Sequence, residues 1–486
     1  MIKKIRAPAP EPLPREALPC LCVDLDGTLL QTDSMLESLL VLIRAKPLHV
    51  FRILLWLFRG KARFKQELGR AVQLHPKAWP YSLPVVDYIE AEFAKGRELF
   101  LVTGADASIA IPIAEHLGLF SGVICSDGHE NVTGAAKLAA IQREFGQRAF
   151  SYAGNSRADI PVWKAAKTAV IAGASSRLQK TVERSGVTIE KVIPGPRFSI
   201  RTIAKAMRIH QWTKNVLVWL PVFLGHHILE RVTLLNAARA FFAFSFCASA
   251  IYLINDLLDL PADRKHPEKR NRPLAAGSLS IPTAVLLTAG LLAAAALLNP
   301  TPAAGVLLAL YSASAFAYSL YLKRLLMVDV VMLAGFYTLR LLYGGASAKI
   351  DVSIWTLAAS MFMFLSLALI KRISELQLRG AEDGLATSRR GYQFSDIQQL
   401  SALCASSGSV AGLVFILYVR SPEVVPLYSH PQLLLGIFPL LAYWQGRLLI
   451  LASRGAIQED PIVFSLFDRA SCIVGIAVLA IVAAAI

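Results

Sequence analysis

The hydrophobic positions divide the chain into two parts. Up to about position 200, apolar stretches are short and alternate with polar segments, which is typical of a mixed α/β protein. From about Asn215 onward, apolar runs follow one another at close intervals. Many are near the length of about 20 residues that a helix needs to cross a bilayer. The pattern therefore predicts an N-terminal α/β domain followed by an all-α, polytopic membrane domain.

Nine runs are candidates for membrane-spanning helices. They cover about 215–230, 237–255, 281–298, 302–321, 326–345, 354–370, 400–419, 432–451 and 470–486. The first is the weakest, because Pro221, Gly225, His226 and His227 interrupt it. Pro and Gly are unfavourable inside a helix.

Basic residues alternate between the connections of these runs. They gather before the first span and after the second, fourth and sixth, as Arg197, Arg201, Lys205, Arg208 and Lys214, then Arg264, Lys265, Lys269, Arg270 and Arg272, then Lys323 and Arg324, then Lys371, Arg372, Arg379, Arg389 and Arg390. The other connections between spans hold few basic residues. Because positive charge stays on the cytosolic side of short loops, we expect the N-terminal domain and these basic loops in the cytosol, at an inner (cytoplasmic) membrane.

Composition narrows the classes of function. Of 486 residues, 55% are hydrophobic and 17% charged, and the net charge is +16. Much of the positive excess lies between apolar runs, which favours a membrane surface or acidic substrates over nucleic acid. The six cysteines form no CxxC pair, so neither a zinc site nor a disulfide framework is indicated. The first 17 residues lack the apolar run of a signal peptide, and we expect a cytosolic tail there.

Three aspartates follow the second apolar run, in the segment NDLLDLPAD that starts at Asn255. On a helix, Asp256, Asp259 and Asp263 would be spaced i, i+3 and i+7 and would share one face. Three anions on one face repel each other unless a cation lies between them, and oxygen ligands that leave room for phosphate suit Mg²⁺. The basic run that follows could bind the remaining phosphate oxygens. The alternative is a solvated loop whose acids and bases pair with each other, but ionisable groups at the end of an apolar span are usually functional.

This segment resembles the first aspartate-rich motif of the UbiA superfamily of intramembrane prenyltransferases. The resemblance covers roughly residues 200–486 and implies nine transmembrane helices with a Mg²⁺-dependent site open to the cytosol. The segments HQWTKNVLVWLPVF, NDLLDLPADRKHPEKRNRPLAAG, YSLYLKRLLMVDVVMLAGFYTLR and KRISEL are closest to the decaprenyl-phosphate phosphoribosyltransferase branch. Members of that branch transfer 5-phosphoribose from phosphoribosyl diphosphate (PRPP) to a polyprenyl phosphate.

The resemblance implies roles for individual residues. The metal and diphosphate motif would comprise Asn255, Asp256, Asp259 and Asp263, with Asp256 and Asp259 central to catalysis. Phosphate ligands would be Lys214, Lys269, Arg270 and Arg272, and the pocket would be completed by Lys323, Asp329, Arg340, Lys371 and Arg372, with Asp329 as a further metal ligand. Lys371 and Arg372 could instead anchor the topology. Asp329 has no second acid nearby, unlike the paired acids typical of aromatic prenyltransferases, and this favours the PRPP-using branch.

The N-terminal part carries a second motif, CLCVDLDGTLL over residues 20–30. Two carboxylates at the carboxyl end of a strand, followed by a glycine and a hydroxyl, suit a nucleophile, an acid/base and a metal site in one loop. The motif resembles motif I of the haloacid dehalogenase (HAD) superfamily, which has a Rossmann-like parallel sheet. Later motifs follow in order, with Thr103 after a strand, Lys137 in a helix, and GNSRAD ending at Asp159.

The HAD resemblance covers about residues 18–190. It implies that Asp24 is the phosphoryl-accepting nucleophile and Asp26 the acid/base, that Thr103 and Lys137 bind phosphate, and that Asp24, Asp26 and Asp159 hold Mg²⁺. Asn155 replaces the usual first acid of the last motif, which should weaken the metal site. A degenerate scaffolding domain is the alternative. Residues 31–85 resemble a helical cap, whose apolar stretch VFRILLWLF could contact the membrane or the cap core.

The predicted organisation is a tail over 1–17, a HAD-like domain over 18–190, an amphipathic linker over 191–214 and a UbiA-like domain over 215–486. The leading hypothesis is a bifunctional enzyme that transfers phosphoribose to a polyprenyl phosphate and then removes the 5-phosphate. One alternative is an aromatic prenyltransferase that uses a polyprenyl diphosphate. Another is a transporter or lipid-binding protein with an inactive HAD domain. The expected partners are PRPP, a polyprenyl phosphate and the lipid bilayer, without nucleic acid, and the pattern is compatible with a homo-oligomer.

Overall fold

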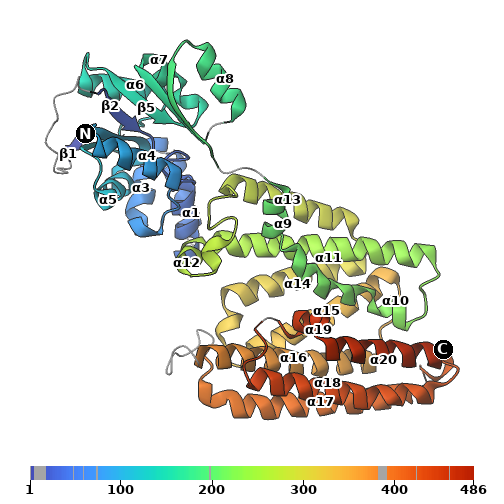
Figure 1. The fold of residues 1–486 in the computed structure, drawn as a ribbon. Coiled ribbons are helices and arrows are strands. Elements are labelled where there is room, and N and C mark those ends of the chain that lie inside the picture. Colours follow the sequence, from blue (N-terminus) through green and yellow to red (C-terminus); the bar gives the residue numbers. More distant parts are fainter. Residues whose placement is uncertain are drawn as a thin grey trace. The chain divides into compact units, whose positions relative to one another are not determined.

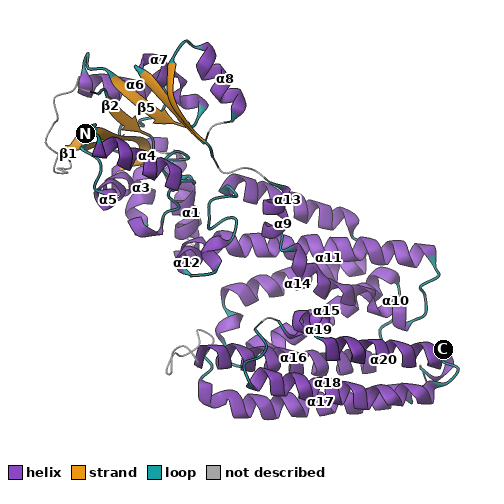
Figure 2. Ribbon diagram, viewed as in Figure 1, coloured by secondary structure: helices purple, strands orange, loops and turns teal. Residues whose placement is uncertain are grey.

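The computed structural model describes residues 2–4, 18–46, 49–58, 60–72, 75–173, 175–195, 199–380, 391–422, 424–458 and 460–486. Arg197, Arg389 and Arg390, used in the topology prediction, and most of the predicted tail lie outside these ranges. The chain forms two compact units (Figures 1 and 2). The first comprises 1–206 with 253–287, and the second comprises 207–252 with 288–486.

A seven-stranded sheet forms the centre of the first unit. Its strands are β1 (Ile2–Lys4), β2 (Cys20–Val23), β3 (Leu99–Asp106), β4 (Gly122–Ser126), β5 (Phe150–Gly154), β6 (Thr168–Ala172) and β7 (Thr188–Ile193). They are ordered β1-β4-β3-β2-β5-β6-β7, and all pairs are parallel except β1 with β4. The catalytic candidates follow central strand β2, between β3 and β5.

Both faces of this sheet are buried under helices. Alternation along β2 sends Leu21 and Val23 to one core and Cys20 and Cys22 to the other. The surrounding helices are α4 (Leu83–Ala94), α5 (Ala107–Leu117), α6 (Ala135–Phe145), α7 (Ile160–Ala165) and α8 (Ser176–Arg184) (Figure 2). The predicted parallel α/β domain is therefore confirmed.

A small helical layer lies between β2 and β3 in the sequence, where a cap was predicted. It comprises α1 (Ser34–Ala45), α2 (Val50–Phe58), α3 (Lys61–Ala71) and the 3-10 turn η2 (Pro76–Ala78). Ile53 of α2 packs in a core with Leu42 and Leu68, which supports the cap-core alternative for one face of this helix. Leu55 and Phe58 on α2 are exposed.

The first unit also contains the aspartate segment. It takes in the end of α11 (Arg231–Leu258), then α12 (Leu260–Lys265), the 3-10 turn η5 (Lys269–Asn271) and the start of α13 (Ile281–Leu298). Helix α9 (Ile200–Ala206) ends the long N-terminal stretch of this unit. The segment from 253 to 287 therefore belongs to the same compact unit as the HAD-like fold.

The second unit is a helical bundle. Its main helices are α14 (Pro302–Leu320), α15 (Val328–Ala348), α16 (Ile354–Gly380), α17 (Ile397–Val419), α18 (Ile437–Ser453), α19 (Pro461–Phe467) and α20 (Arg469–Ala485), with most of α11 and the end of α13. Shorter elements are η4 (Ile209–Trp219), α10 (Leu220–Leu224), η6 (Leu322–Arg324), η7 (Phe394–Asp396), η8 (Val425–Leu427) and η9 (Pro431–Gly436).

Within the described residues, seven helices are long and apolar enough to span a membrane, or eight if the bent pair α19 and α20 is one span. With the bent pair counted as one span, these helices match eight of the nine predicted spans. The predicted span without a match is the first, where the 3-10 segment η4 is followed by the five-residue helix α10, which carries Pro221 in its first turn and is capped by Gly225.

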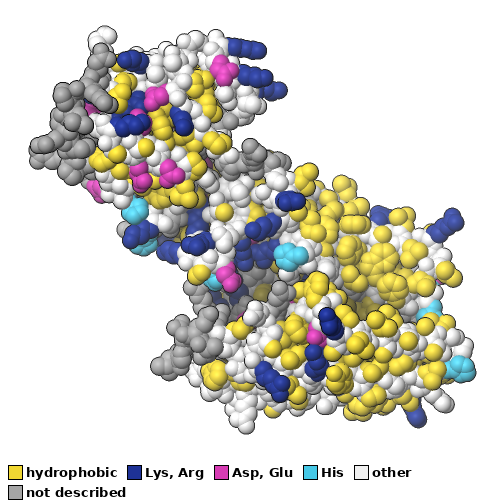
Figure 3. All heavy atoms as spheres, in the orientation of Figure 1, with side chains coloured by type: hydrophobic (Ala, Val, Ile, Leu, Met, Phe, Trp, Pro, Cys, Tyr) yellow, Lys and Arg dark blue, Asp and Glu magenta, His cyan; other side chains and the backbone are white. Residues whose placement is uncertain are grey.

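Large apolar side chains cover the outer surface of these helices. Figure 3 shows them gathered over the helical bundle, and exposed examples are Val232, Leu286, Leu297, Val306, Leu413 and Leu479. In water such surfaces would favour aggregation, whereas in a bilayer they contact lipid. The predicted fold class, an all-α membrane domain, is therefore confirmed.

Candidate active sites

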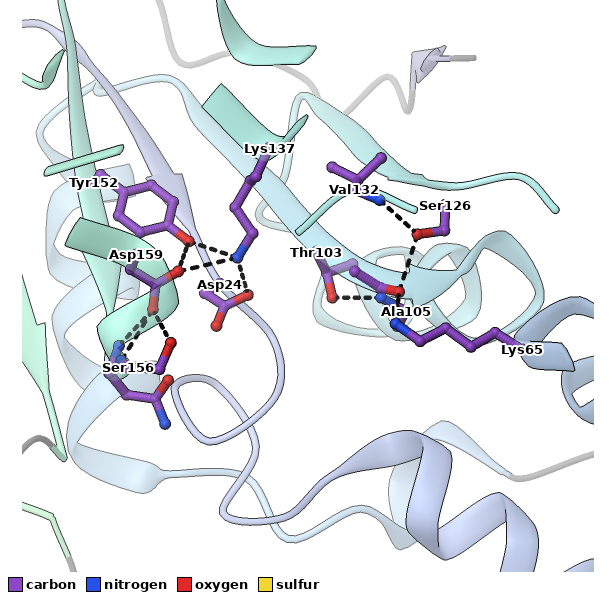
Figure 4. Close-up of polar contacts among 12 residues, drawn as sticks. Asp24, Lys65, Thr103, Ala105, Ser126, Val132, Lys137, Tyr152, Ser156 and Asp159 are labelled. Atoms are coloured by element: carbon purple, nitrogen blue, oxygen red, sulfur yellow. Dashed lines mark hydrogen bonds and ion pairs between the residues drawn. The ribbon is translucent and has the colours of Figure 1, made fainter. Parts of the chain in front are cut away.

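The first site lies where β2, β3 and β5 end. Asp24 directly follows β2, and its backbone N–H donates to the Ala153 carbonyl at 2.9 Å. Lys137 of α6 donates from Nζ to Asp24 Oδ1 at 2.8 Å, to Asp159 Oδ1 at 3.2 Å and to the Tyr152 hydroxyl at 2.7 Å (Figure 4). All four side chains are buried. Three of these residues were predicted from sequence, and the structure brings them together.

Tyr152 was missed. Its hydroxyl donates to Asp159 Oδ1 at 2.8 Å and so fixes the acid from the side opposite Ser156, which donates to Oδ2 at 2.8 Å. A tyrosine within a buried strand carries no sequence signal that separates a site residue from a core residue.

Burial and charge shift the ionisation of this site. Burial alone would lower the pKa of Lys137, but its attraction to Asp24 and Asp159 outweighs this effect. Burial alone would raise the pKa of Asp159, but its attraction to Lys137 and its hydrogen bonds from Ser156 outweigh this effect. The pKa of Lys137 is therefore raised and that of Asp159 lowered, and both groups are charged at neutral pH. Burial raises the pKa of Asp26 to about 7, although the Ser34 N–H donates to its Oδ1 at 2.8 Å.

The segment that contains Thr103, the second predicted HAD motif, contacts the cap beside this cluster. Thr103 on β3 is fully buried, and its hydroxyl accepts from the Ala105 N–H at 3.0 Å (Figure 4). Lys65 of cap helix α3 donates to the Gly104 carbonyl at 2.7 Å and to Asn131 Oδ1 at 3.0 Å. Sequence analysis did not single out Lys65. The phosphate-binding role of Thr103 stays a prediction.

Asn155 packs against the turn of motif I. Gly27 has φ +74°, and a Cβ built there would lie 2.0 Å from Asn155 Nδ2. Mg²⁺ is bound by oxygen ligands. Asp24 and Asp159 supply carboxylate oxygens and Asn155 an amide oxygen, so the chemistry of these residues fits such an ion. Among the described residues, however, no group of three His, Cys, Asp or Glu side chains suits a metal ion.

The aspartate motif is divided by a break between two helices. Helix α11 ends at Leu258, and Asp259 is the N-cap residue of α12, where Pro261 occupies the first turn. The three acids therefore do not lie on one unbroken helix, although Asp256 and Asp263 still face the same arginine. Asp256 and Asp263 are buried and share Arg272, whose Nη1 lies 3.1 Å from Asp256 Oδ1 and 2.6 Å from Asp263 Oδ2.

Asp259 has a different partner. Arg44 of cap helix α1 places Nη1 2.5 Å from Asp259 Oδ1 and donates to the Leu258 carbonyl at 2.7 Å. Asn255 lies one turn before Asp259 and accepts its backbone N–H at 2.8 Å. Lys269 and Arg270 lie in η5, where Arg270 is exposed. The ligand roles of these residues stay predictions.

In the second unit, two predicted lysines meet at an acid that was not predicted. Lys214 and Lys371 place their Nζ atoms 2.8 and 2.9 Å from Asp460 Oδ2. Asp460 also caps α19, where Oδ1 accepts from the Ile462 N–H at 3.2 Å. In the sequence, Asp460-Pro461 before an apolar run indicates only a helix start.

Asp329 lies in a second, buried cluster. Its Oδ2 is 2.9 Å from Arg372 Nη2, and its Oδ1 accepts from the Tyr392 hydroxyl at 2.6 Å. Asp329 is 0% and Arg372 1% exposed, and Arg372 also pairs with Glu375. This arrangement pairs two predicted site residues, Asp329 and Arg372, with each other. Their predicted roles toward metal and phosphate are not tested by it.

Arg340 is enclosed by aromatic rings. Its Nε donates to Asn215 Oδ1 at 2.9 Å, and its guanidinium lies 4.9, 5.5 and 5.3 Å from the ring centres of Phe244, Tyr311 and Tyr337. Cation–π attraction compensates part of the cost of burying this charge. The remaining predicted residue, Lys323, lies in η6.

Fold and sites together define a multi-pass membrane protein with a UbiA-like helical domain and an N-terminal HAD-like domain. The UbiA prenyltransferase family model matches residues 218–454, and that of the haloacid dehalogenase-like hydrolases matches 21–164. The chain belongs to the UbiA prenyltransferase family and carries a HAD-like domain in addition. Both domain types are enzymatic.

Similarity to a curated relative extends over nearly the whole chain. The uncharacterized protein y4nM of Sinorhizobium fredii is 35% identical over 464 residues, which are 94% of this chain and 89% of that protein. The decaprenyl-phosphate phosphoribosyltransferase of Corynebacterium glutamicum is 39% identical over 180 residues, 36% of this chain and 54% of that one. Among solved structures, a UbiA homolog from Archaeoglobus fulgidus bound to GPP and Mg²⁺ has 17% identity and a TM-score of 0.45, covering 58% of this chain and 99% of that one.

Proposed function

We propose that the protein transfers 5-phosphoribose from PRPP to a polyprenyl phosphate, and that the HAD-like domain then removes the 5-phosphate from the lipid-linked product. The first step forms a bond between a phosphate oxygen of the lipid and ribose C1. It breaks the bond from C1 to the diphosphate, which leaves as inorganic diphosphate. The second step hydrolyses a phosphomonoester and releases inorganic phosphate.

The observation that carries the first step is the cluster of Asp256, Asp263 and Arg272. There the positive side chain of Arg272 contacts both buried carboxylates. A Mg²⁺ ion held by Asp256 and Asp259 together with the phosphate oxygens of the donor would neutralise the leaving diphosphate. Arg272 is suited to bind phosphate oxygens bidentately. The partial similarity to phosphoribosyltransferases supports PRPP as the donor.

The lipid acceptor needs no base from the protein, because its phosphate is already anionic. Catalysis would therefore rest on positioning and on stabilisation of the leaving charge. The apolar surface of the bundle gives a polyprenyl chain access from the bilayer. We further propose that both sites face the cytosol, where PRPP as a soluble, charged donor would reach them.

The second step is supported by buried Lys137 and the three buried residues that it contacts. Asp24 would attack the phosphorus and form a phosphoaspartyl intermediate, and Lys137 would balance the charge of the phosphate and of both acids. Asp26 would donate a proton to the departing 5′ oxygen and then accept one from the attacking water.

The test uses the full-length protein in nanodiscs with a polyprenyl phosphate and PRPP labelled in the ribose. We expect Mg²⁺-dependent appearance of label in the lipid fraction, and loss of that signal in Asp256→Asn. Prenyl diphosphate with an aromatic acceptor serves as the competing substrate pair. Prenylation of the acceptor without any lipid-bound ribose would overturn the proposal.

A further inference from the structure

Cap helix α1 of the HAD-like domain contacts the aspartate segment at two charged residues. Both elements belong to the first compact unit. Glu37 and Arg44 lie on α1, two turns apart on the same side of the helix. Glu37 binds Arg264 of α12, and Arg44 binds Asp259. Two residues of one helix thus hold the segment at the start and the end of α12.

The pair of Glu37 and Arg264 is buried and bidentate. The side chains are 3% and 7% exposed, Nη2 of Arg264 lies 2.6 Å from Oε1 of Glu37, and Nη1 contacts Oε2. Arg264 Nε also donates to the Ala275 carbonyl at 3.1 Å. Arg264 therefore joins the cap to both sides of the loop that contains Arg272.

The burial of Glu37 needs an explanation. An acid on a cap helix is ordinarily solvated, and a buried carboxylate without a partner is costly. Both carboxylate oxygens of Glu37 accept hydrogen bonds from Arg264. A close approach nearby supports the same docking, because a Cβ at Gly277 would lie 2.7 Å from Gln31 Cβ. The cap surface is thus shaped to receive this loop.

We propose that helix α1 is a positioning element of the phosphoribosyl-transfer site. Glu37 fixes the loop through its ion pair with Arg264. Arg44 binds Asp259. Once a metal ion binds Asp259, the Arg44 side chain would bind the diphosphate of the donor instead. This inference rests on the proposed function for its substrate. The inference goes beyond the proposed function because it gives the HAD-like domain a part in the transfer step, in addition to phosphate removal.

The first test is a charge-reversal cycle in the full-length protein in nanodiscs. Glu37→Arg and Arg264→Glu each leave like charges in a buried site, and we expect each to lower the melting temperature and to reduce kcat/KM for PRPP by about tenfold or more. The double variant restores the pair with its direction reversed and should recover most of both losses. The matched control is Glu130→Arg, which reverses one member of the exposed pair with Arg143 and should change neither.

The second test separates positioning from folding. Arg44 is partly exposed, so Arg44→Gln should keep the wild-type melting temperature while raising KM for PRPP severalfold, with a smaller change in kcat. Hydrolysis of p-nitrophenyl phosphate by the HAD-like domain should not change in this variant. An Arg44→Gln protein with an unchanged KM, or a double variant no better than the worse single one, would overturn the inference.

The two proposals fail in distinguishable ways. Melting temperatures in the cycle need no substrate, so they report docking of α1 even if wild-type protein transfers no ribose from PRPP. A wild-type protein that transfers no ribose from PRPP would refute the proposed function, but it would leave the docking of α1 on the aspartate segment untouched. Active wild-type protein with additive losses in the cycle would refute the positioning role alone.

Discussion

The buried cluster of Asp329, Arg372 and Tyr392 makes a quantitative prediction about the membrane domain. Asp329 is fully buried, and its two oxygens are contacted by Arg372 at 2.9 Å and by the Tyr392 hydroxyl at 2.6 Å. Arg372→Met would leave the carboxylate without its counter-charge. Removing one partner of a buried pair costs about 3–5 kcal/mol. Replacing both charges by apolar groups of similar size is often nearly neutral.

We therefore expect Arg372→Met to lower the melting temperature strongly and Asp329→Leu/Arg372→Met to recover most of the loss. Tyr392→Phe removes one hydrogen bond to a charged group and should cost about 1.5–3 kcal/mol. The hydroxyl also accepts from the Met327 N–H at 3.1 Å, which places the change at the upper end of that range. The assay is thermal unfolding of detergent-solubilised protein, followed by intrinsic fluorescence. Additive losses from the two single changes would refute the pairing.

Three further predictions concern the HAD-like domain. Arg97→Met should destabilise the protein by about 3–5 kcal/mol in thermal unfolding, because Glu92 and Glu190 would lose their ion pairs with this buried guanidinium, at 2.7 and 2.6 Å, and Glu92 would be left with the exposed Lys95. Arg143→Met at an exposed pair should have little effect. Gly27→Ala should reduce both stability and phosphatase activity, since φ is +74° and the new Cβ would meet Asn155 Nδ2 at 2.0 Å; unaltered melting would contradict this. Burial would raise the pKa of Glu190, but hydrogen bonds from Arg97, Thr168 and Tyr88 outweigh it and lower the pKa to about 2. Because the folded-state pKa is depressed, the stabilisation is fully present above about pH 4.5 and is lost as the pH falls toward 2. The Glu190 side chain is 27% exposed, so solvent screening limits the effect to about 1 kcal/mol, and the melting difference between wild type and Glu190→Gln should shrink from pH 6 to pH 3.

The fold class could be predicted from sequence because periodicity and length are local properties. Short apolar stretches between polar segments indicated the α/β domain, and long apolar runs indicated the bundle, whereas the parallel sheet was implied by the resemblance to the HAD superfamily. The first predicted span failed because Pro221 and Gly225 divide it into a 3-10 segment and a short helix. The aspartate motif differs from the prediction for a similar reason, since a new helix begins at Leu260 with Pro261 in its first turn.

The candidate sites were only partly visible in the sequence. Asp24, Lys137 and Asp159 could be predicted because they lie in segments that resemble HAD motifs in the expected order. Tyr152 and Asp460 could not, because a strand tyrosine and a helix cap look the same whether or not they contact a site residue. The ion pair of Glu37 and Arg264 joins residues 227 positions apart, and no local pattern specifies such a pairing.

The measurement that tests the central claim most directly is the fate of the 5-phosphate. Wild-type and Asp24→Asn proteins in nanodiscs would be given a polyprenyl phosphate, Mg²⁺ and PRPP, and the lipid products would be identified by mass spectrometry. We predict lipid-linked ribose without the 5-phosphate from the wild type, and lipid-linked phosphoribose at an undiminished transfer rate from Asp24→Asn. Identical lipid products from the two proteins, or no ribose on the lipid from either, would contradict the account.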